Sequence, residues 1–344
     1  MNVILRLGEL EKENVPLLSL LQKHLSVSID RQRLDWLYRY CPHGEATVWV
    51  AAEADSGRLV GAAAVFPRRI NLGGTVENGF VLGDFCVSAD YRSLGLAIRL
   101  QRKCLEIVQN GRFAAGYDLP GKSMVAVYRR LGSKPNDEMV RMVKLLRADG
   151  KIAVKVKLRT VASLLSGIAN LVLRVQHGSP RRQSGVSFEV QEGRCGQEYT
   201  DLARSVQGRL GICVDRTAEY LNWRYLDHPH EKYEILAARR KGQLEGYVAF
   251  RQEGSRASVV DWFGQEPAEL RKDLIREMIA LVKPRGCESV QACVLASHSF
   301  LSDLRSLGFL PRESSPVVFL GPSGKEPGSS EKRSWLLMDG DREA

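Results

Sequence analysis

The chain contains two copies of one pattern, and this duplication limits the folds that it can adopt. A segment from Leu34, LDWLYRYCPHGEATVWVAA, is matched at an offset of 187 residues by LNWRYLDHPHEKYEILAA from Leu221. Further on, LPGKSMVAVYRRLGSKP from Leu119 is matched at an offset of 176 residues by LASHSFLSDLRSLGFLP from Leu295. Two pairs in the same order indicate a duplicated domain. The smaller second offset shows that the second copy is shorter between these two segments.

Each copy has the same predicted order of elements. A helix is followed by a short helix with Trp-x-Tyr, a β-hairpin, a strand, a long helix, another strand, a helix ending in Leu-Gly and a last strand. This order predicts an α+β fold with a central, mostly antiparallel sheet flanked by helices. We expect one domain at residues 1–147 and a second at 187–344. Trp36 and Trp223, which correspond in the two copies, are expected to pack each within its own domain.

The segment between the copies, residues 148–186, is predicted to be a basic amphipathic helix followed by a flexible loop. Much of the net charge of +10 lies here, since residues 147–182 hold eight basic side chains and one acidic side chain. This segment packs its apolar face on the two domains or, alternatively, lies on an anionic membrane surface. No helix-turn-helix or zinc-finger pattern is present, so we expect no nucleic-acid partner.

The cysteines and the N-terminus indicate a cytoplasmic protein. The seven cysteines form no CxxC pair, which is typical of reduced thiols and not of a disulfide framework or a zinc site. His228 and His230 are predicted to belong to a turn, and we expect no metal. The sequence shows no signal peptide and no stretch of ~18 apolar residues that would span a membrane.

One loop of the first copy has the features of an anion site. The apolar strand FVLGDFCVS, residues 80–88, is followed by ADYRSLGLA and then by a helical pattern. The first backbone N–H groups of a helix have no intrahelical partner, and the helix dipole favours an anion there. Gly95 lets the backbone approach the anion and can adopt a positive φ. Ala97 keeps the loop open, and Arg92 adds a cation.

These residues resemble the GNAT superfamily of acyl-CoA-dependent N-acyltransferases, which carries an (Arg/Gln)-x-x-Gly-x-(Gly/Ala) loop after its fourth strand. Arg92, Gly95 and Ala97 match that loop, and Tyr128 precedes a Leu-Gly helix end as in the family. Ser133 departs from the usual aromatic residue after this glycine, and the frequent asparagine at the start of that helix is absent. The tandem layout resembles two-domain GNAT proteins found with bacterial polysaccharide biosynthesis.

The resemblance implies a site for acetyl-CoA as co-substrate and a transfer of its acyl group to an amine. It implies that the pyrophosphate and pantetheine of CoA are held by the loop and the strand before it: Phe85, Cys86, Val87, Arg92, Ser93, Leu94, Gly95, Leu96 and Ala97. Tyr128 is the predicted acid for the CoA thiolate, and Asp84 is the first candidate for the base, followed by Glu77. Asp84 could alternatively pair with an arginine, because Asp261 has a similar context in the second copy.

The second copy lacks the loop. The strand ASVVDWFG leads directly into QEPAELRKDLIREM, and Leu304 stands where the first copy has Tyr128. We therefore expect a non-catalytic second domain and one active site for an N-acetyltransferase acting on a primary amine, with an amino sugar as the suggested acceptor. The alternatives are a non-catalytic CoA-binding or scaffold protein, and an aminoacyl transferase of the related FemAB type.

Overall fold

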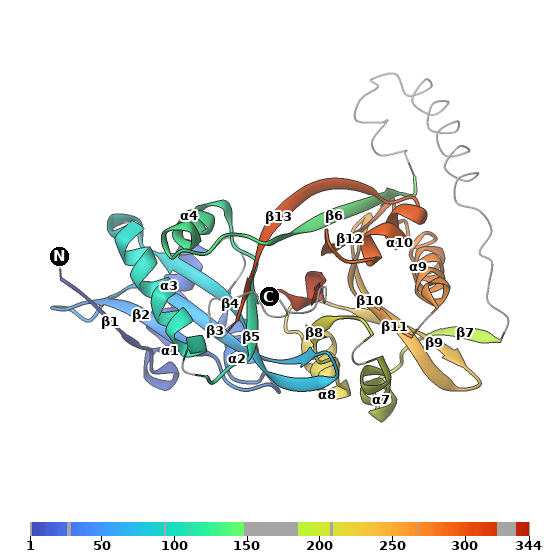
Figure 1. Ribbon diagram of the computed structural model, residues 1–344, viewed down its shortest axis with the longest axis horizontal. Helices are drawn as coiled ribbons and strands as arrows, with labels where there is room; N and C mark the ends of the chain where they lie inside the picture. The colour runs from blue at the N-terminus through green and yellow to red at the C-terminus, as the bar shows by residue number, and fades with distance from the viewer. Residues whose placement is uncertain are drawn as a thin grey trace, which may run out of the picture.

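The computed structural model describes residues 2–25, 29–92, 94–109, 111–147, 185–206, 209–265, 267–321 and 335–343 (Figure 1). The helix predicted between the copies lies outside these residues. The first half contains β1 (Val3–Leu7), α1 (Leu10–His24), α2 (Arg31–Tyr38), β2 (Thr47–Glu53), β3 (Leu59–Leu72), β4 (Thr75–Val87), η1 (Ala89–Tyr91), α3 (Leu94–Gln109), β5 (Ala115–Asp118), α4 (Lys122–Arg130) and β6 (Asp137–Leu145).

The second half follows the same plan with a few additions. It contains β7 (Val186–Val190), α7 (Gln197–Val206), β8 (Ile212–Val214), α8 (Ala218–Leu221), η2 (Asn222–Leu226), β9 (Glu234–Arg240), β10 (Gln243–Glu253), β11 (Arg256–Gly264), α9 (Ala268–Val282), β12 (Ser289–Leu295), α10 (Phe300–Ser306), β13 (Leu310–Leu320), β14 (Trp335–Leu336) and η3 (Asp339–Asp341).

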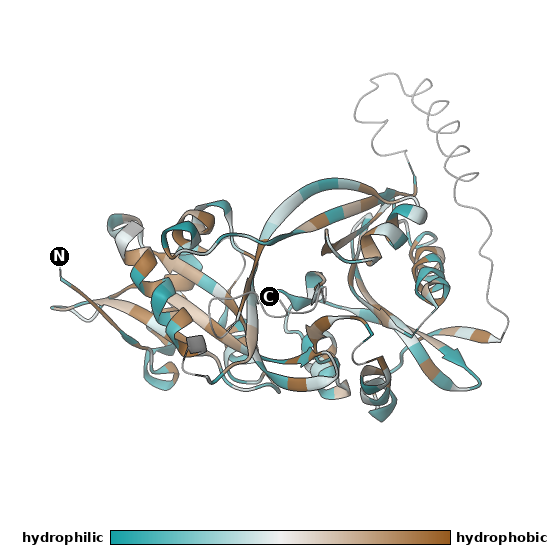
Figure 2. Cartoon of the chain, viewed as in Figure 1, coloured by the Kyte–Doolittle hydropathy of each residue, from teal (hydrophilic) through white to brown (hydrophobic). Residues whose placement is uncertain are grey.

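The helices cover the sheet with their apolar faces, as the hydropathy colours show (Figure 2). In α3, Leu96, Leu100 and Cys104 recur at helical spacing and are buried, while Arg99 and Arg102 on the other side are exposed. The central strand β3 is buried on both faces because its run GAAAVF has small and apolar side chains throughout. In the described part of the chain, no helix is long and apolar enough to cross a membrane.

The main path of the sheet is a palindrome. Its strand order is β1-β2-β3-β4-β5-β13-β6-β12-β11-β10-β9-β7, so that corresponding strands of the two halves lie at equal distances from the centre. The pairs β4–β5 and β11–β12 are parallel, and all other neighbours in this order are antiparallel. The predicted α+β fold class, with two copies of one domain, is therefore confirmed.

The last strand of each half lies in the other half. β13 pairs with β5 of the first half, and β6 pairs with β12 of the second, while β6 and β13 also pair with each other. Figure 1 shows these two strands crossing side by side between the halves. Residues 1–147 therefore do not complete their sheet alone, and each copy depends on the other for its sixth strand.

Two equivalent tryptophans form the second contact between the halves. The rings of Trp36 and Trp223 are stacked, with their centroids 4.8 Å apart. The indole N–H of Trp36 donates to the carbonyl of Trp223 at 2.9 Å, and the indole N–H of Trp223 donates to the carbonyl of Trp36 at 3.0 Å. The expectation that each tryptophan packs within its own domain is wrong, because each fills a place that only the other copy provides.

The C-terminal segment, residues 335–343, runs back through the centre of the molecule (Figure 1). β14 pairs in parallel with β8, Met338 forms a bridge with Val294 of β12, and η3 packs against β11 and β12. A Cβ at Gly340 would lie 2.8 Å from the carbonyl oxygen of Val260, so this close approach requires glycine. The segment occupies the gap between β11 and β12 beyond Val259, where their pairing ends.

We expect Trp36→Phe to lower the free energy of unfolding by ~1–3 kcal/mol, because it leaves the buried carbonyl of Trp223 without its donor. Urea unfolding followed by circular dichroism measures the change. Trp49→Phe is the control, because the indole N–H of Trp49 has no hydrogen-bond partner. An equal loss in the two variants would contradict the assigned role of the reciprocal hydrogen bonds.

Candidate active site

The strands β4 and β5 separate along their length and leave a gap in the sheet. They pair only from Gly79 to Val81, opposite Ala115 to Tyr117, and β5 ends at Asp118 while β4 continues to Val87. Two adjoining cavities, of about 520 and 490 Å³, lie at this gap. Both are lined by His24, Phe85, Ser123 and Met124, so they form one continuous site at the C-terminal end of these two strands.

The first cavity, which we call the loop cavity, is lined by Arg92, Ala97, Cys86 and Val87. These four residues, with Phe85, are the predicted CoA-binding residues that the structure brings together. Burial raises the pKa of the Cys86 thiol to about 12, so this thiol is neutral. Leu96 packs into the apolar core beneath α3, and Ser93 and the side chain of Leu94 lie outside the described residues.

Gly95 lies in the first turn of α3, and its φ is not positive. Gly95 therefore does not adopt the left-handed conformation that a glycine allows. A Cβ at this position would meet no atom within 4 Å. Glycine here leaves the start of α3 open, which lets a ligand come close to the backbone N–H groups at the beginning of the helix.

The second cavity, which we call the carboxylate cavity, is lined by Asp84, Asp118 and Glu343. Asp118 ends β5 and accepts a hydrogen bond from the Tyr128 hydroxyl at 2.6 Å. Burial raises the pKa of Asp118 to about 7, although the bond from Tyr128 lowers it. Gln101 donates to the Tyr128 oxygen at 2.8 Å. Tyr128 is fully buried and meets the cavity only through these neighbours, and burial raises its pKa well above the ordinary value.

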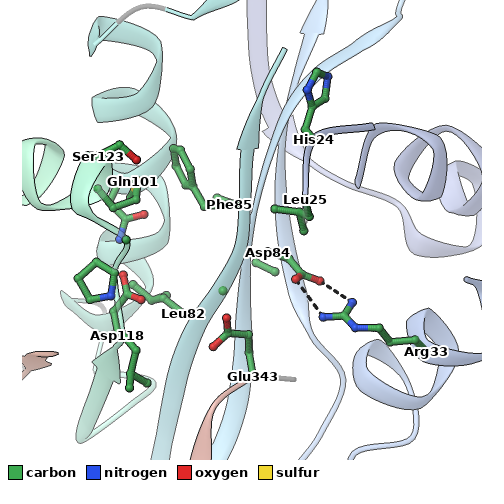
Figure 3. Close-up of a pocket in the computed structure, with 17 residues that line it drawn as sticks. His24, Leu25, Arg33, Leu82, Asp84, Phe85, Gln101, Asp118, Ser123 and Glu343 are labelled. Atoms are coloured by element: carbon green, nitrogen blue, oxygen red, sulfur yellow. Dashed lines mark hydrogen bonds and ion pairs between the residues drawn. The ribbon is translucent and has the colours of Figure 1, made fainter. Parts of the chain in front are cut away.

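Asp84 lies at a bulge of β4 with a φ of 43°, which is unusual for a residue other than glycine. Its two carboxylate oxygens accept from Arg33 at 3.2 Å each (Figure 3). One of them also accepts from the Tyr38 hydroxyl at 2.8 Å. In the second half, Asp261 is likewise held by Arg216 at 3.0 Å and by Tyr247 at 2.7 Å. The same arrangement in the copy without the loop favours the structural alternative for Asp84.

Glu343 reaches the site from the other end of the chain. Figure 3 shows its carboxylate beside β4, between Asp118 and Arg33. A Cβ at Gly83 would lie 2.5 Å from the Glu343 Cγ, so glycine makes room for this side chain. Burial raises the pKa of Glu343, and the nearby Asp84 raises it further.

The sequence analysis missed Asp118 and Glu343. Asp118 could have been found as a carboxylate at the end of a predicted strand, ten residues before Tyr128. Glu343 had no local signal, because its place depends on the path of the C-terminal segment. The same segment fills the gap between β11 and β12 in the second half, where Leu304 is fully buried at the position of Tyr128.

Comparison with known proteins finds a family that matches part of the first half. Residues 24–135, about a third of the chain, match the family described as Acetyltransferase (GNAT) domain. These residues are therefore similar to a GNAT acetyltransferase domain. The match includes β4, the loop, α3, Asp118 and Tyr128. It confirms the expectation of an N-acyltransferase enzyme at the level of this domain. A search of curated proteins finds no match.

Solved structures share the fold across both halves. A probable N-acyltransferase from Enterococcus faecalis has a TM-score of 0.67 at 13% identity, over 93% of this chain and 73% of that one. A GCN5-related N-acetyltransferase from Anabaena variabilis has a TM-score of 0.65 at 14% identity, over 92% and 72%. A tandem GNAT protein from the clavulanic acid biosynthesis pathway has a TM-score of 0.57 at 13% identity, over 94% and 100%. At these identities the likeness shows the fold, including its tandem arrangement.

We expect Gly95→Asp to weaken CoA binding by about tenfold or more without lowering the melting temperature. The added carboxylate meets no protein atom but repels the pyrophosphate. Calorimetric titration with CoA measures the affinity. Gly95→Asn is the control, since it adds nearly the same volume without the charge. Equal weakening by both variants would mean that the loop does not hold an anion.

Proposed function

We propose that this protein transfers the acyl group of acetyl-CoA to a primary amine, with its one active site in the gap between β4 and β5. The observation that carries the proposal is the pair of adjoining cavities, one beside a helix N-terminus and the other lined by carboxylates. CoA occupies the loop cavity, the acceptor amine occupies the carboxylate cavity, and the acyl group lies where the two cavities meet.

The end of β4 supports the binding of the pantetheine arm. Beyond Val81, β4 has no described partner on the side of β5, so the backbone groups of Phe85 to Val87 are free on that side to pair with the pantetheine amides. The pyrophosphate lies at the N-terminus of α3, beside Arg92. A backbone N–H of this strand polarises the acyl carbonyl.

The acid–base steps are assigned to Asp118 and Tyr128. The amine attacks the thioester carbonyl, the C–N bond forms and the C–S bond breaks. Before it attacks, an acceptor that enters as an ammonium ion loses one proton to the solvent. The ionised Asp118 takes the proton that the nitrogen loses as the amide forms and passes it to the departing thiolate. Tyr128 reaches the cavity only through its neighbours, so its proposed part in this acid step is to donate to Asp118 through the 2.6 Å hydrogen bond between them. For Asp84 we propose a positioning role, in which its bulge and Arg33 fix the wall of the cavity.

Glu343 and the second half complete the acceptor side. The carboxylates of Glu343 and Asp118 attract a cationic amine into the cavity. The second half delivers Glu343 and supplies β13 beside β5, and we propose no catalysis for it. An amino sugar of a bacterial surface polysaccharide is the acceptor that the resemblance suggests. We also propose that the segment between the two copies comprises residues 148–186 and that it contacts a membrane.

The test is acyl transfer by the full chain. Purified protein is incubated with acetyl-CoA and a panel of primary amines that begins with amino sugars, and the released CoA thiol is measured. We expect thiol release that depends on the amine. Binding of acetyl-CoA without transfer to any amine would favour the scaffold alternative. Transfer from an aminoacyl-tRNA, without acetyl-CoA binding, would favour the FemAB alternative.

We expect kcat/KM to fall as the pH is lowered through about 7, because Asp118 must be ionised to accept a proton and burial raises its pKa to that value. Tyr128→Phe removes the hydrogen bond that lowers this pKa, so the acidic limb of the profile moves to higher pH. Asp118→Asn abolishes the limb and lowers kcat by ~10²–10⁴-fold.

The exposed Asp55 provides the matched control, since Asp55→Asn removes the same charge from the turn after β2. The titration of the amine itself is common to all variants and cancels in the comparison. An acidic limb at the same pH in Tyr128→Phe and in the unchanged protein would rule out Asp118 as the base.

A further inference from the structure

A third cavity, of about 510 Å³, lies where the two halves meet, and the proposed transfer does not use it. Its lining comes from α2 in the first half, from η2, the loop between η2 and β9, β10 and β11 in the second, and from the C-terminal segment. We call it the interface cavity. It is mainly cationic, because its four arginines outnumber its two carboxylates: Arg33, Arg224, Arg251 and Arg342 against Glu231 and Asp339.

Three of the four arginines already have a carboxylate partner. Their ion pairs are Arg33 with Asp84, Arg251 with Glu231, and Arg342 with Asp339. The two histidines of the lining add no negative charge, so the cavity stays mainly cationic. Burial lowers the pKa of His228 to about 4, so that ring is neutral near pH 7, and the ring of His230 contacts Asp30 at 2.9 Å.

Arg224 differs from the other three. It is only 3% exposed, and it forms no ion pair with any carboxylate of the described residues. Its Nε donates to the carbonyl of Gly340 at 2.7 Å, and its Nη2 donates to the carbonyl of Arg342 at 3.2 Å. Its guanidinium lies over the ring of Trp36, and its Nη1 has no hydrogen-bond partner.

A buried guanidinium with an unused donor would be stabilised by a bound anion. Burying a charge is costly unless an opposite charge or hydrogen bonds compensate it. Two carbonyls and an aromatic face compensate Arg224 only in part, and its free Nη1 belongs to a residue that lines the cavity. The volume is in the range of small-molecule sites, and the planar fork of an arginine suits a carboxylate or a phosphate.

We infer that the interface cavity binds the phosphate or carboxylate group of a small molecule, with Arg224 as its central donor and Arg251 beside it. Arg33 lines both this cavity and the carboxylate cavity. The anion can therefore belong to the acceptor, with its amine in the carboxylate cavity, or to a separate small molecule. The first source rests on the proposed function, whereas the binding itself does not.

The experiment titrates the full chain with inorganic phosphate at constant ionic strength. CoA is kept at saturation, so that the loop cavity cannot take up the phosphate. Binding is followed by tryptophan fluorescence, because Arg224 stacks on Trp36 and Trp36 stacks on Trp223. We expect a saturable change in fluorescence. The absence of saturable binding in the millimolar range would overturn the proposal.

Two substitutions in one ion pair give opposite expectations. Arg251→Gln removes a cation and weakens phosphate binding by ~3–10-fold, whereas Glu231→Gln frees Arg251 from its carboxylate and strengthens binding by a similar factor. Arg285→Gln is the control, since Arg285 is paired with Glu234 outside the cavity. A purely structural ion pair predicts the same change for both variants, and that result would overturn the proposal.

Arg224→Gln tests the central donor, with at least tenfold weaker binding expected. Its melting temperature is measured alongside, and the Arg251 and Glu231 variants decide the matter if Arg224→Gln does not fold.

Once an acceptor amine is known, kinetics with added phosphate show whether the bound anion belongs to the acceptor or to a separate ligand. Phosphate that raises the KM of the amine at constant kcat assigns the anion to the acceptor. Phosphate that alters kcat without raising that KM assigns it to a separate ligand.

Discussion

The exchange of the last strands between the two halves is the constraint on which the rest of the structure depends. β13 completes the sheet of the first half beside β5, and β6 completes that of the second beside β12. Because each strand also pairs with the other, the sheet is continuous across the molecule. The last strand of each copy therefore pairs only with strands of the other copy, and we expect the two halves to unfold as one cooperative unit.

The same approximate symmetry places the two copies of the Trp-x-Tyr motif against each other. Trp36 and Trp223 meet face to face and exchange hydrogen bonds, and each ring also receives an arginine: Arg224 over Trp36 and Arg68 over Trp223. The symmetry ends at the two gaps in the sheet. In the first half the gap between β4 and β5 is open and holds the two cavities. In the second half the C-terminal segment fills the equivalent gap.

This difference leaves one open gap and explains which residues line it. The segment that closes the second gap continues toward the first and brings Glu343 beside β4. Glu343 and Asp118 both lie at the open gap. Their pKa values are raised because burial removes the water that would stabilise their charges. The second half has no loop like that from Arg92 to Ala97. It contributes to the carboxylate cavity through the C-terminal segment, which carries Glu343.

The sequence by itself determined the duplication, the order of the elements, the fold class and the loop from Arg92 to Ala97. These are local features, since periodicity, turn residues and the start of a helix depend on neighbours along the chain. Tyr128 was proposed through the resemblance to the GNAT family, although its burial could not be predicted. The sequence could not show that Asp84 is held by Arg33, because an ion pair between distant residues leaves no pattern in one sequence.

Only the tertiary structure decided which strands complete each sheet, how Trp36 meets Trp223, and which carboxylates share a cavity. Asp118 and Glu343 are more than two hundred residues apart, and they line the same cavity because a palindromic sheet brings the end of the chain back to its centre. The only partly compensated charge of Arg224 likewise exists only after folding, since burial removes the water that stabilises a guanidinium in the unfolded chain.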